Sequence, residues 1–367
     1  MVTRSDDLER LKQPVEAKDG VAGIERPNAL HQLLDEDPQP LLEMAHRHLV
    51  SARQISRRQL VQLCRLAAAF EMDPVMEGKP LEGKLLITAF YEPSTRTRLS
   101  FESAWHRLGG DVIPITDAST TGIAKGESLR DVAEMLSNYG DVVVLRDSSE
   151  DSVERMVEAL RIPIINAGNG IDEHPTQALA DLYAIFKWCP QLALPAQARD
   201  HNVRIGIIGT PRRMRTVRSL LLLLRLIAEG IREVTIINPE SDLFDPGQRE
   251  ELEEAGLRIR ASRRLKDVLP QLDVVYINSI AWIGDTYETL TGDLKLSADS
   301  PLKPGAIVLH PLARGDELDT DLDPTPHNWY FAQARGAVFV RMALLTVLMQ
   351  RVYRVADAPL PTKAKPQ

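Results

Sequence analysis

The sequence predicts a two-domain α/β protein in which each domain is a mostly parallel sheet flanked by helices. Its 367 residues exceed what one ordinary hydrophobic core holds together. Short apolar runs alternate with helical patterns along most of the chain, which is typical of βαβ units. A polar stretch with two prolines, CPQLALPAQARDHN at 189–202, interrupts this alternation once, and a second alternating series follows it. The interruption therefore marks the boundary between two domains.

The chain begins with a segment, 1–44, that mixes charge, proline and glycine with little periodicity. We expect an N-terminal extension here, partly disordered or loosely docked. The run SRRQLVQLCRLAAAF at 56–70 predicts the first long helix. Beyond the extension we expect a first domain over 45–185, a second over 186–340, a helix over 341–356 that returns to the first domain, and a loose tail over 357–367.

Apolar runs bounded by turn residues predict the strands of both sheets. In the first domain they lie at 84–90, 111–116, 141–146 and 162–168, and helical patterns follow them near 95–108, 127–139, 151–160 and 174–187. In the second domain the runs lie at 203–209, 233–239, 257–261, 273–279 and 305–310. The last strong helical pattern, at 334–355, is apolar on much of its circumference, so we expect that helix to be buried.

The composition argues against several classes of protein. Lys and Arg number 44 against 52 Asp and Glu, a formal charge of −8, which disfavours general nucleic-acid binding and anionic membrane surfaces. The two cysteines, Cys64 and Cys189, lie far apart and outside any CxxC pattern, so neither a disulfide framework nor structural zinc is expected. No run of about 18 apolar residues occurs, and the charged start lacks the apolar core of a signal peptide. We therefore expect a soluble cytoplasmic protein.

The stretch YEPSTRTRLSFESAWHRLGG, at 91–110, predicts a helix that begins near Ser94, directly after an apolar strand. The first turn of a helix has unpaired N–H groups and the positive end of the helix dipole, which suit an anion. A cap by Ser94 or Thr95 is the simpler interpretation. It does not explain Arg96 and Arg98, because a cation at this end of a helix is disfavoured unless an anion binds there. The stretch therefore favours a phosphate or carboxylate site.

Three further polar residues or pairs in the first half follow predicted strands, at the edge where open α/β sheets bind ligands. Lys125 lies in a loop bracketed by glycines, and Arg146 ends a strand; each alone is more often a solvated surface charge. His174 and Gln177 lie three residues apart at the start of a helix, and so share one face. Both can hydrogen-bond one acceptor, such as a carbonyl oxygen. A helix cap by His174 is the alternative.

Two stretches of the second half also follow strands. GIIGTPRRMRTVRSL, at 206–220, contains two glycines but not the third of GxGxxG, so it is a weak dinucleotide signal. It is instead rich in arginine: Arg212, Arg213, Arg215 and Arg218. IVLHPLARGDELD, at 307–319, is an irregular loop that could offer backbone carbonyls to a hydrogen-bond donor.

Taken in order, these stretches resemble the aspartate/ornithine carbamoyltransferase family, and its aspartate branch most closely. The resemblance covers about 45 to 355. It rests on S-T-R-T-R at 94–98, K-G-E at 125–127, H-P-T-Q at 174–177, R-T-V at 215–217, H-P-L at 310–312 and TPHNWYFAQARGAVFVRMALL at 325–345. The resemblance implies an enzyme without metal or organic cofactor, whose first domain binds carbamoyl phosphate and whose second binds an amino acid. An amine then attacks the carbamoyl carbon and phosphate leaves, so no protein nucleophile is needed.

The resemblance also implies roles for single residues. The phosphate would be bound by Ser94, Thr95, Arg96 and Thr97. The carbamoyl oxygen would be held by Thr97, Arg146 and His174. The carbamoyl NH2 group would be oriented by Gln177 and the backbone carbonyl of Leu312. Arg215 would bind a carboxylate of the acceptor, and Lys125 would reach into the site of a neighbouring subunit, because the family forms trimers, or multiples of trimers, with shared sites.

The acceptor pocket departs from the pattern of the resembled family. Aspartate enzymes have an Arg and a Gln that clamp the side-chain carboxylate of aspartate, and Ser279 and Ala281 stand at those places here. Asn278 and Trp282 do not restore the ornithine pattern either, and Ala313 replaces a proline. Two alternatives follow: a paralogue that carbamoylates a different amine, or a non-catalytic scaffold or regulatory chain. Retention of Arg96, Lys125, Arg146, His174 and Gln177 argues against the second.

Overall fold

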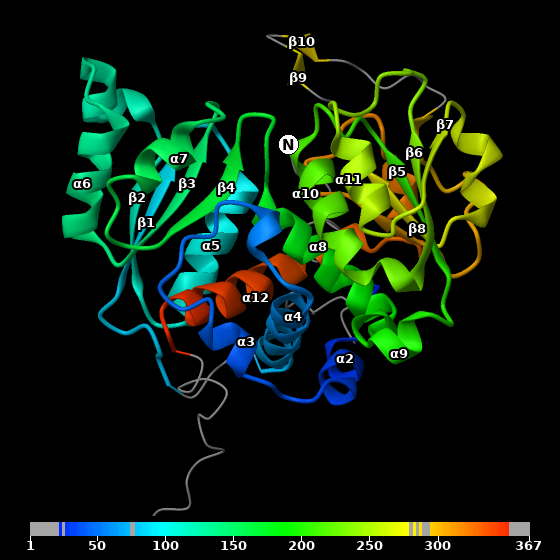
Figure 1. The fold of residues 1–367 in the computed structure, drawn as a ribbon, viewed down its shortest axis with the longest axis horizontal. Coiled ribbons are helices and arrows are strands. Elements are labelled where there is room, and N and C mark those ends of the chain that lie inside the picture. Colours follow the sequence, from blue (N-terminus) through cyan, green and yellow to red (C-terminus); the bar gives the residue numbers. More distant parts are fainter. Residues whose placement is uncertain are drawn as a thin grey trace, which may run out of the picture.

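Two parallel sheets, one in each domain, form the framework of the computed structural model (Figure 1). The structure describes residues 22–23, 26–73, 78–278, 282–283, 286–287 and 294–351. Of the expected parts, the first 21 residues and the tail over 357–367 lie outside the described residues.

The first sheet has the strand order β2-β1-β3-β4, and each neighbouring pair is parallel. Its strands are β1 (Leu85–Phe90), β2 (Asp111–Ile115), β3 (Val142–Asp147) and β4 (Ile164–Asn169). The helices that follow them are α5 (Thr95–Arg107), α6 (Leu129–Tyr139), α7 (Ser152–Val157) and α8 (Pro175–Trp188). These elements confirm the predicted βαβ alternation. β2 is an edge strand, and most of its residues are exposed.

The second sheet has the strand order β11-β8-β5-β6-β7, again with parallel pairs. Its strands are β5 (Val203–Ile208), β6 (Ile231–Ile237), β7 (Ile259–Ser262), β8 (Val274–Ile277) and β11 (Ile307–Leu309), accompanied by α10 (Arg215–Leu224) and α11 (Gln248–Glu254). A short antiparallel pair, β9 (Trp282–Ile283) with β10 (Thr286–Tyr287), was not predicted. The five predicted strands are confirmed.

Short helical turns complete the secondary structure. They are η1 (Ala52–Gln54), η2 (Ala118–Thr120), η3 (Gly122–Lys125), η4 (Pro190–Ala193), α9 (Pro195–Ala198), η5 (Arg225–Gly230), η6 (Leu265–Asp267), η7 (Leu269–Gln271) and η9 (Thr320–Leu322).

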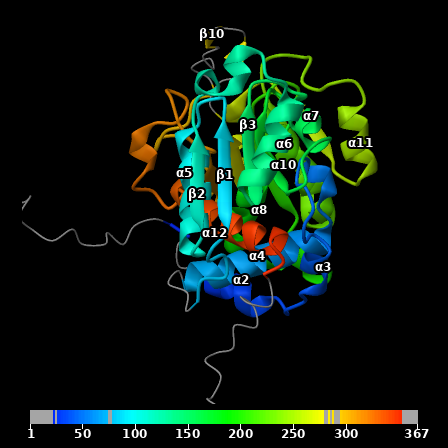
Figure 2. The same ribbon diagram turned by 90° about the vertical axis from the view of Figure 1, so that its left-hand side faces the viewer.

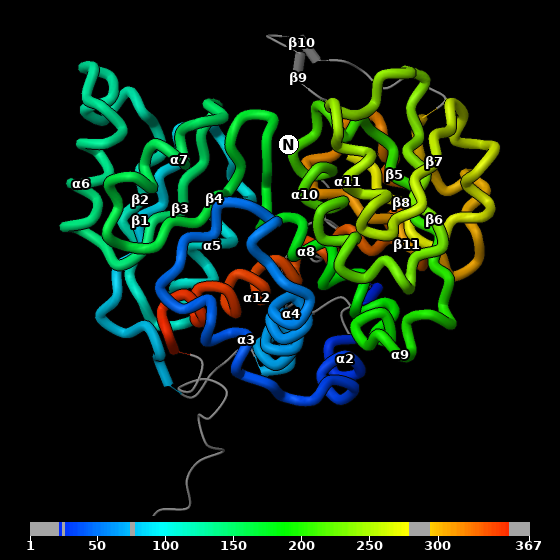
Figure 3. Tube along the Cα trace, in the orientation of Figure 1, coloured from blue at the N-terminus to red at the C-terminus, as the bar shows by residue number. Residues whose placement is uncertain are grey.

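Helix α12 (Tyr330–Leu348) returns from the second domain to the first. Figure 3 shows the chain crossing between the two domains near α8 and crossing back at α12. There α12 packs against α4 (Arg57–Met72), α5 and α8, and Figure 2 shows α4 and α12 together beneath the first sheet. This confirms the predicted return. The helix begins earlier than the pattern at 334–355 suggested and ends at Leu348, while 352–355 lie outside the described residues.

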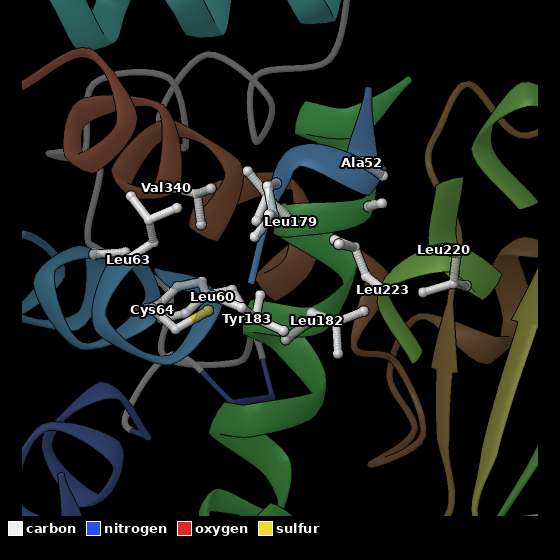
Figure 4. Close-up of a cluster of buried hydrophobic side chains, with 14 of the residues drawn as sticks. Ala52, Leu60, Leu63, Cys64, Leu179, Leu182, Tyr183, Leu220, Leu223 and Val340 are labelled. Atoms are coloured by element: carbon white, nitrogen blue, oxygen red, sulfur yellow. The ribbon is translucent and has the colours of Figure 1, made fainter. Parts of the chain in front are cut away.

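Helices α4, α8, α10 and α12 share one apolar core (Figure 4). Among the side chains that meet there are Leu63 of α4, Leu182 of α8, Leu223 of α10 and Val340 of α12. Helix α12 is long and apolar enough to cross a membrane, but 78% of its most apolar window is buried inside the protein. It is therefore a core helix, as predicted.

Part of the segment expected to be a loose extension is instead integral to the core. Helices α2 (Pro27–Leu33) and α3 (Gln39–Leu42) pack on α4, and Leu30, Leu34 and Leu41 are buried. Both helices are too short for the apolar period to stand out in the sequence. The expectation of loose docking was therefore wrong for 27–42.

Candidate active site

Two arginines from different domains meet at one carboxylate, Glu92, directly after β1. Arg146 lies at the end of the neighbouring strand β3, paired with Phe90 in register, and its Nη2 donates to Glu92 Oε1 at 2.5 Å. Arg215 is the first residue of α10 in the second domain. Its Nη1 lies 3.0 Å from Glu92 Oε2 and its Nη2 lies 2.8 Å from Oε1. Glu92 therefore links the domains, although no motif in the sequence points to this role.

The charged groups at this junction shift one another's pKa values. Burial and the nearby Arg215 charge lower the pKa of Arg146 to about 10. Burial acts to raise the pKa of Glu92, but hydrogen bonds and charge from Arg215 and Arg146 outweigh it, so this pKa is lowered. One carboxylate thus faces two guanidinium groups, which leaves local positive charge for a further anion. A Cβ at Gly168 would lie 3.0 Å from Arg146 Nη1 and 3.2 Å from Arg215 Nε, so a side chain here would crowd both.

His174 lies beside these arginines, immediately before α8. Within the described chain its side chain caps no helix N–H, so the capping alternative was wrong. Its backbone N–H donates to Ser219 Oγ at 2.9 Å, whereas Nδ1 is buried without a partner among the described residues. Burial, followed by the charges of Arg146, Arg215 and Arg341, holds the pKa of His174 well below its usual value. At neutral pH it is therefore a neutral imidazole with one N–H to donate.

Glu173, which the sequence did not single out, fixes the loop before α8. Its carboxylate accepts from Ser51 Oγ at 2.5 Å, from the Ala52 N–H at 2.8 Å and from Ser219 Oγ at 3.1 Å. The first two groups precede α4 and the third lies on α10. Glu173 thus ties three parts of the chain together and holds Ser219 where it receives the His174 N–H.

The S-T-R-T-R turn separates its two arginines structurally. Arg98 forms an ion pair with Glu102 one turn along α5, with a distance of 3.0 Å. Arg96 is exposed and pairs with no carboxylate in the described part of the chain, although its charge contributes to lowering the pKa of His310. No helix-capping bond from the Ser94 side chain occurs within the described residues, so the simple cap is also wrong for Ser94. Only Arg96 is thus available for an anion.

The loop after β11 is shaped by His310. The imidazole Nδ1 accepts the Leu312 N–H at 2.8 Å, which assigns its proton to Nε2, and Nε2 donates to Glu317 Oε1 at 2.8 Å. Both His310 and Glu317 are buried, and Leu312 has a φ of 47°.

Gln177, on the first turn of α8, donates from Nε2 to Asp181 at 2.7 Å.

Lys125 forms no hydrogen bond or ion pair with the residues of this junction in the described part of the chain. It ends η3 in the loop after the edge strand β2, and its side chain is exposed. No carboxylate of the described residues pairs with it. The structure therefore brings together Arg146, His174 and Arg215 and places Arg96 near His310, whereas Lys125 bonds to none of them within the described residues.

On the acceptor side, Ser279 and Ala281 lie outside the described residues. The neighbouring arginines are engaged by carboxylates of their own domain. Arg212 pairs with Asp242, Arg213 with Glu240, and Arg218 with Asp245.

A surface cavity and a metal centre are the other kinds of site to consider among the described residues. A surface cavity of about 290 Å³ lies between η1, α10 and α11, where Arg53 pairs with Glu251, but it includes none of the expected carbamoyl-phosphate residues. No group of three or more His, Cys, Asp or Glu side chains in the described part of the chain is arranged to hold a metal ion.

Family models match both halves of the chain. Residues 47–187 match "Aspartate/ornithine carbamoyltransferase, carbamoyl-P binding domain". Residues 201–348 match "Aspartate/ornithine carbamoyltransferase, Asp/Orn binding domain".

Curated relatives and solved structures agree with these matches. The aspartate carbamoyltransferase catalytic subunit of Methanopyrus kandleri is 39% identical over 315 residues, covering 83% of this chain and 98% of that protein. The corresponding subunit of Methanocaldococcus jannaschii is 36% identical over 312 residues, with the same coverage. The aspartate transcarbamoylase of Trypanosoma cruzi, solved with carbamoyl aspartate and phosphate, has a TM-score of 0.73 and 31% identity, and the match covers 84% of this chain and 98% of that one.

Proposed function

Since the chain belongs to the aspartate/ornithine carbamoyltransferase family, we propose that it transfers the carbamoyl group of carbamoyl phosphate to the amino group of an amino acid, with aspartate as the first candidate. One observation supports this most strongly. Arg146 and Arg215 meet at Glu92 with His174 beside them, shortly before the helix turn on which Arg96 has no ion-pair partner among the described residues. This arrangement brings together hydrogen-bond donors and positive charges, which both anionic substrates, carbamoyl phosphate and the amino acid, require.

The reaction needs no covalent intermediate on the protein. The amine nitrogen attacks the carbamoyl carbon and a C–N bond forms. The bond from that carbon to the phosphate oxygen breaks, and its electron pair leaves with phosphate. The proton lost by the amine passes to the departing phosphate or to water. The products are the carbamoylated amino acid and phosphate.

The donor would lie on the first turn of α5. We assign the phosphate to Ser94, Thr95, Arg96 and Thr97, whose N–H groups and hydroxyls follow β1. Arg146 and His174, with Thr97, would hydrogen-bond the carbamoyl oxygen and stabilise the negative charge that develops on it. A neutral His174 fits this role because it donates one hydrogen bond without adding a second buried charge. Gln177 and the Leu312 carbonyl would accept from the carbamoyl NH2.

The acceptor would bind between the domains. Arg215 already binds the Glu92 carboxylate at two points, which is the geometry that a substrate carboxylate needs. The second carboxylate of aspartate would face Ser279 and Ala281, which are poor replacements for a clamp. This favours a second candidate, carbamoylation of an amine that lacks that carboxylate. The pairing of Arg212 and Arg218 with Asp242 and Asp245 adds weight to it.

We further propose a cytoplasmic homotrimer, or a multiple of trimers, in which Lys125 completes the site of a neighbour. Two features support this. Lys125 is exposed and pairs with no carboxylate among the described residues, and the edge strand β2 before it is largely exposed. Leu99 on α5 and Ile113 on β2 are also exposed apolar side chains, which a subunit contact would cover.

The deciding experiment is an acceptor screen with saturating carbamoyl phosphate and phosphate release as the readout. Turnover with aspartate supports the family activity, and faster turnover with another amine at equal concentration supports the second candidate. A chain that releases no phosphate with any of the amines would be the non-catalytic scaffold. Arg98→Ala serves as a matched control, because Arg98 lies on the same turn but is paired with Glu102.

A further inference from the structure

Asp181 is a buried carboxylate on α8, one turn beyond Gln177. It is completely inaccessible to solvent. Two amides donate to the same oxygen, Oδ1: Gln177 Nε2 at 2.7 Å and Gln333 Nε2 at 2.6 Å. Gln177 lies on the same face of α8 at the i,i+4 spacing, whereas Gln333 lies on α12.

Asp181 Oδ1 accepts both hydrogen bonds, whether the carboxyl group is ionised or has its proton on Oδ2, so each amide turns its NH2 group toward Asp181. The carbonyl oxygen of each glutamine is then forced to point the other way. In Gln333 that oxygen accepts the backbone N–H of His310 at 2.8 Å. In Gln177 it has no hydrogen-bond partner among the residues that the structure describes. The orientation leaves Gln177 Oε1 free to accept from a ligand.

The second hydrogen-bonded branch from Asp181, here called the second arm, runs through Gln333 to the loop that contains Leu312. Gln333 holds His310 through the backbone N–H, and His310 Nδ1 accepts the Leu312 N–H. The position of the Leu312 backbone thus depends on the same buried carboxylate. Two hydrogen-bond acceptors from different domains, Gln177 Oε1 and the Leu312 carbonyl, are oriented from one point.

We propose that Asp181 is a positioning residue for the carbamoyl NH2: it aims Gln177 Oε1, and through Gln333 and His310 it sets the Leu312 carbonyl, so that both accept from this one group. The inference rests on the proposed function, because it needs carbamoyl phosphate as the donor. It assigns Asp181 no contact with substrate.

The environment of Asp181 is costly for a carboxylate, which argues against a purely structural role. Burial raises the pKa of Asp181 to about 7, although Gln177, Gln333, Tyr276 and the charge of Arg341 act in the opposite direction. The Tyr276 hydroxyl interacts with this carboxylate, yet neither it nor Asp181 Oδ2 has a well-formed hydrogen bond within the described chain. An apolar residue of similar volume would avoid this cost. The role of Asp181 in directing the two amides through Oδ1 therefore explains the carboxyl group better than packing does.

The test compares two ligands that differ in the carbamoyl group. Carbamoyl phosphate has its C=O and NH2 groups, and inorganic phosphate has neither. In Asp181→Asn the side chain can turn its own NH2 toward Gln177, so the orientation is no longer enforced. We expect calorimetric binding of carbamoyl phosphate to weaken about 5- to 30-fold, as for one or two lost hydrogen bonds, and binding of phosphate to change less than about twofold. In a Gln177→Ala background, Asp181→Asn should have a much smaller effect on this preference.

Glu71→Gln is the matched control, because Glu71 is a buried carboxylate that pairs with Lys187 of α8 away from the site. It should lower the melting temperature without changing the preference for carbamoyl phosphate. Equal weakening of both ligands in Asp181→Asn, or an unchanged preference, would overturn the inference. If Asp181→Asn does not fold, Gln333→Met tests the second arm with the same two ligands. A wild-type chain that does not prefer carbamoyl phosphate would instead refute the proposed function itself.

Discussion

Arg146 and Arg215 come from different domains and share one oxygen atom: Glu92 Oε1 lies 2.5 Å from Arg146 Nη2 and 2.8 Å from Arg215 Nη2. Glu92 thereby occupies the guanidinium groups that we assign to the two substrates. We expect Glu92→Gln to lower kcat about 10- to 100-fold, because the two cations lose the group that holds them in place, while inorganic phosphate binds no more weakly. Steady-state kinetics and a phosphate titration check this. Wild-type kcat in a folded variant would contradict it; Asp151→Asn, an exposed position after β3, is the control.

Arg96→Ala should remove a charge-assisted contact with the departing phosphate. The expected loss is on the order of 3–5 kcal/mol, or about 10²- to 10⁴-fold in rate. Arg98→Ala on the same turn should change the rate less than about threefold, because Arg98 is bound to Glu102. The measurement is turnover of both variants at matched folded fractions. Equal losses in the two would refute the assignment of the phosphate to Arg96.

Hybrid assembly tests whether sites are shared between subunits. Lys125→Ala and His174→Ala chains should each be inactive, and mixing them should recover activity at interfaces that combine an intact Lys125 with an intact His174. Chains bearing Arg146→Ala and His174→Ala should not rescue one another, because these two residues lie in the same chain's junction. Activity after refolding equimolar mixtures is the readout. Hybrids that regain nothing in the first mixture would place each site within one chain.

Because His174 is neutral in the folded protein, the free energy of unfolding should fall as the pH becomes acidic. Its pKa in the folded protein is held well below the usual 6.5, first by burial and then by the charges of Arg146, Arg215 and Arg341. Below about pH 6.5 the unfolded chain binds a proton that the folded chain does not, so this group's contribution is complete above that pH and is lost as pH falls. We expect His174→Gln to lose less unfolding free energy between pH 7 and 5 than the wild type. Denaturant titrations measure it, with the exposed His201→Gln as control; parallel losses would disprove it.

Aspartate should saturate the enzyme only weakly. The family resemblance puts Ser279 and Ala281 in place of a bidentate cation and an amide, which implies a loss of roughly 2–4 kcal/mol, or about 30- to 1000-fold in affinity. Half-saturation in the millimolar range or poorer is expected, together with better use of an acceptor that lacks the second carboxylate. The double substitution Ser279→Arg with Ala281→Gln should improve saturation by aspartate. Tight use of aspartate by the unmodified chain would refute the argument of a missing clamp.

The sheets could be predicted because their strands are short apolar runs bounded by turn residues, and all of those runs became parallel strands. Helices α2 and α3 could not, because one or two turns are too short to show a period. The start of α12 was misjudged since Tyr330 and Gln333 extend a pattern that looked complete from residue 334. The proposed domain limits and the roles of single site residues remain predictions.

Only part of the candidate site could be predicted from the sequence. Arg96 and Arg98 are equivalent in the motif, and only packing shows that Glu102 engages the second. Glu92 and Glu173 act through partners that are distant in sequence, which no local pattern reveals. For Asp181 a local signal did exist: Gln177 and Asp181 have the i,i+4 spacing of neighbours on a helix. This spacing alone does not indicate a function, because the rest of the network, Gln333 and His310, is distant in sequence.

The double crossing of the chain, out along α8 and back along α12, means that one cut cannot separate the protein into its two domains. A protease that cut within the segment 189–202 would leave a second fragment whose last helix is still embedded between α4, α5 and α8 of the first. The fragments should therefore stay associated and copurify. Conversely, a recombinant first half that ends before β5 would lack α12 and expose the apolar surface around Leu63 and Leu182, so it should be insoluble unless the 330–348 peptide is supplied with it.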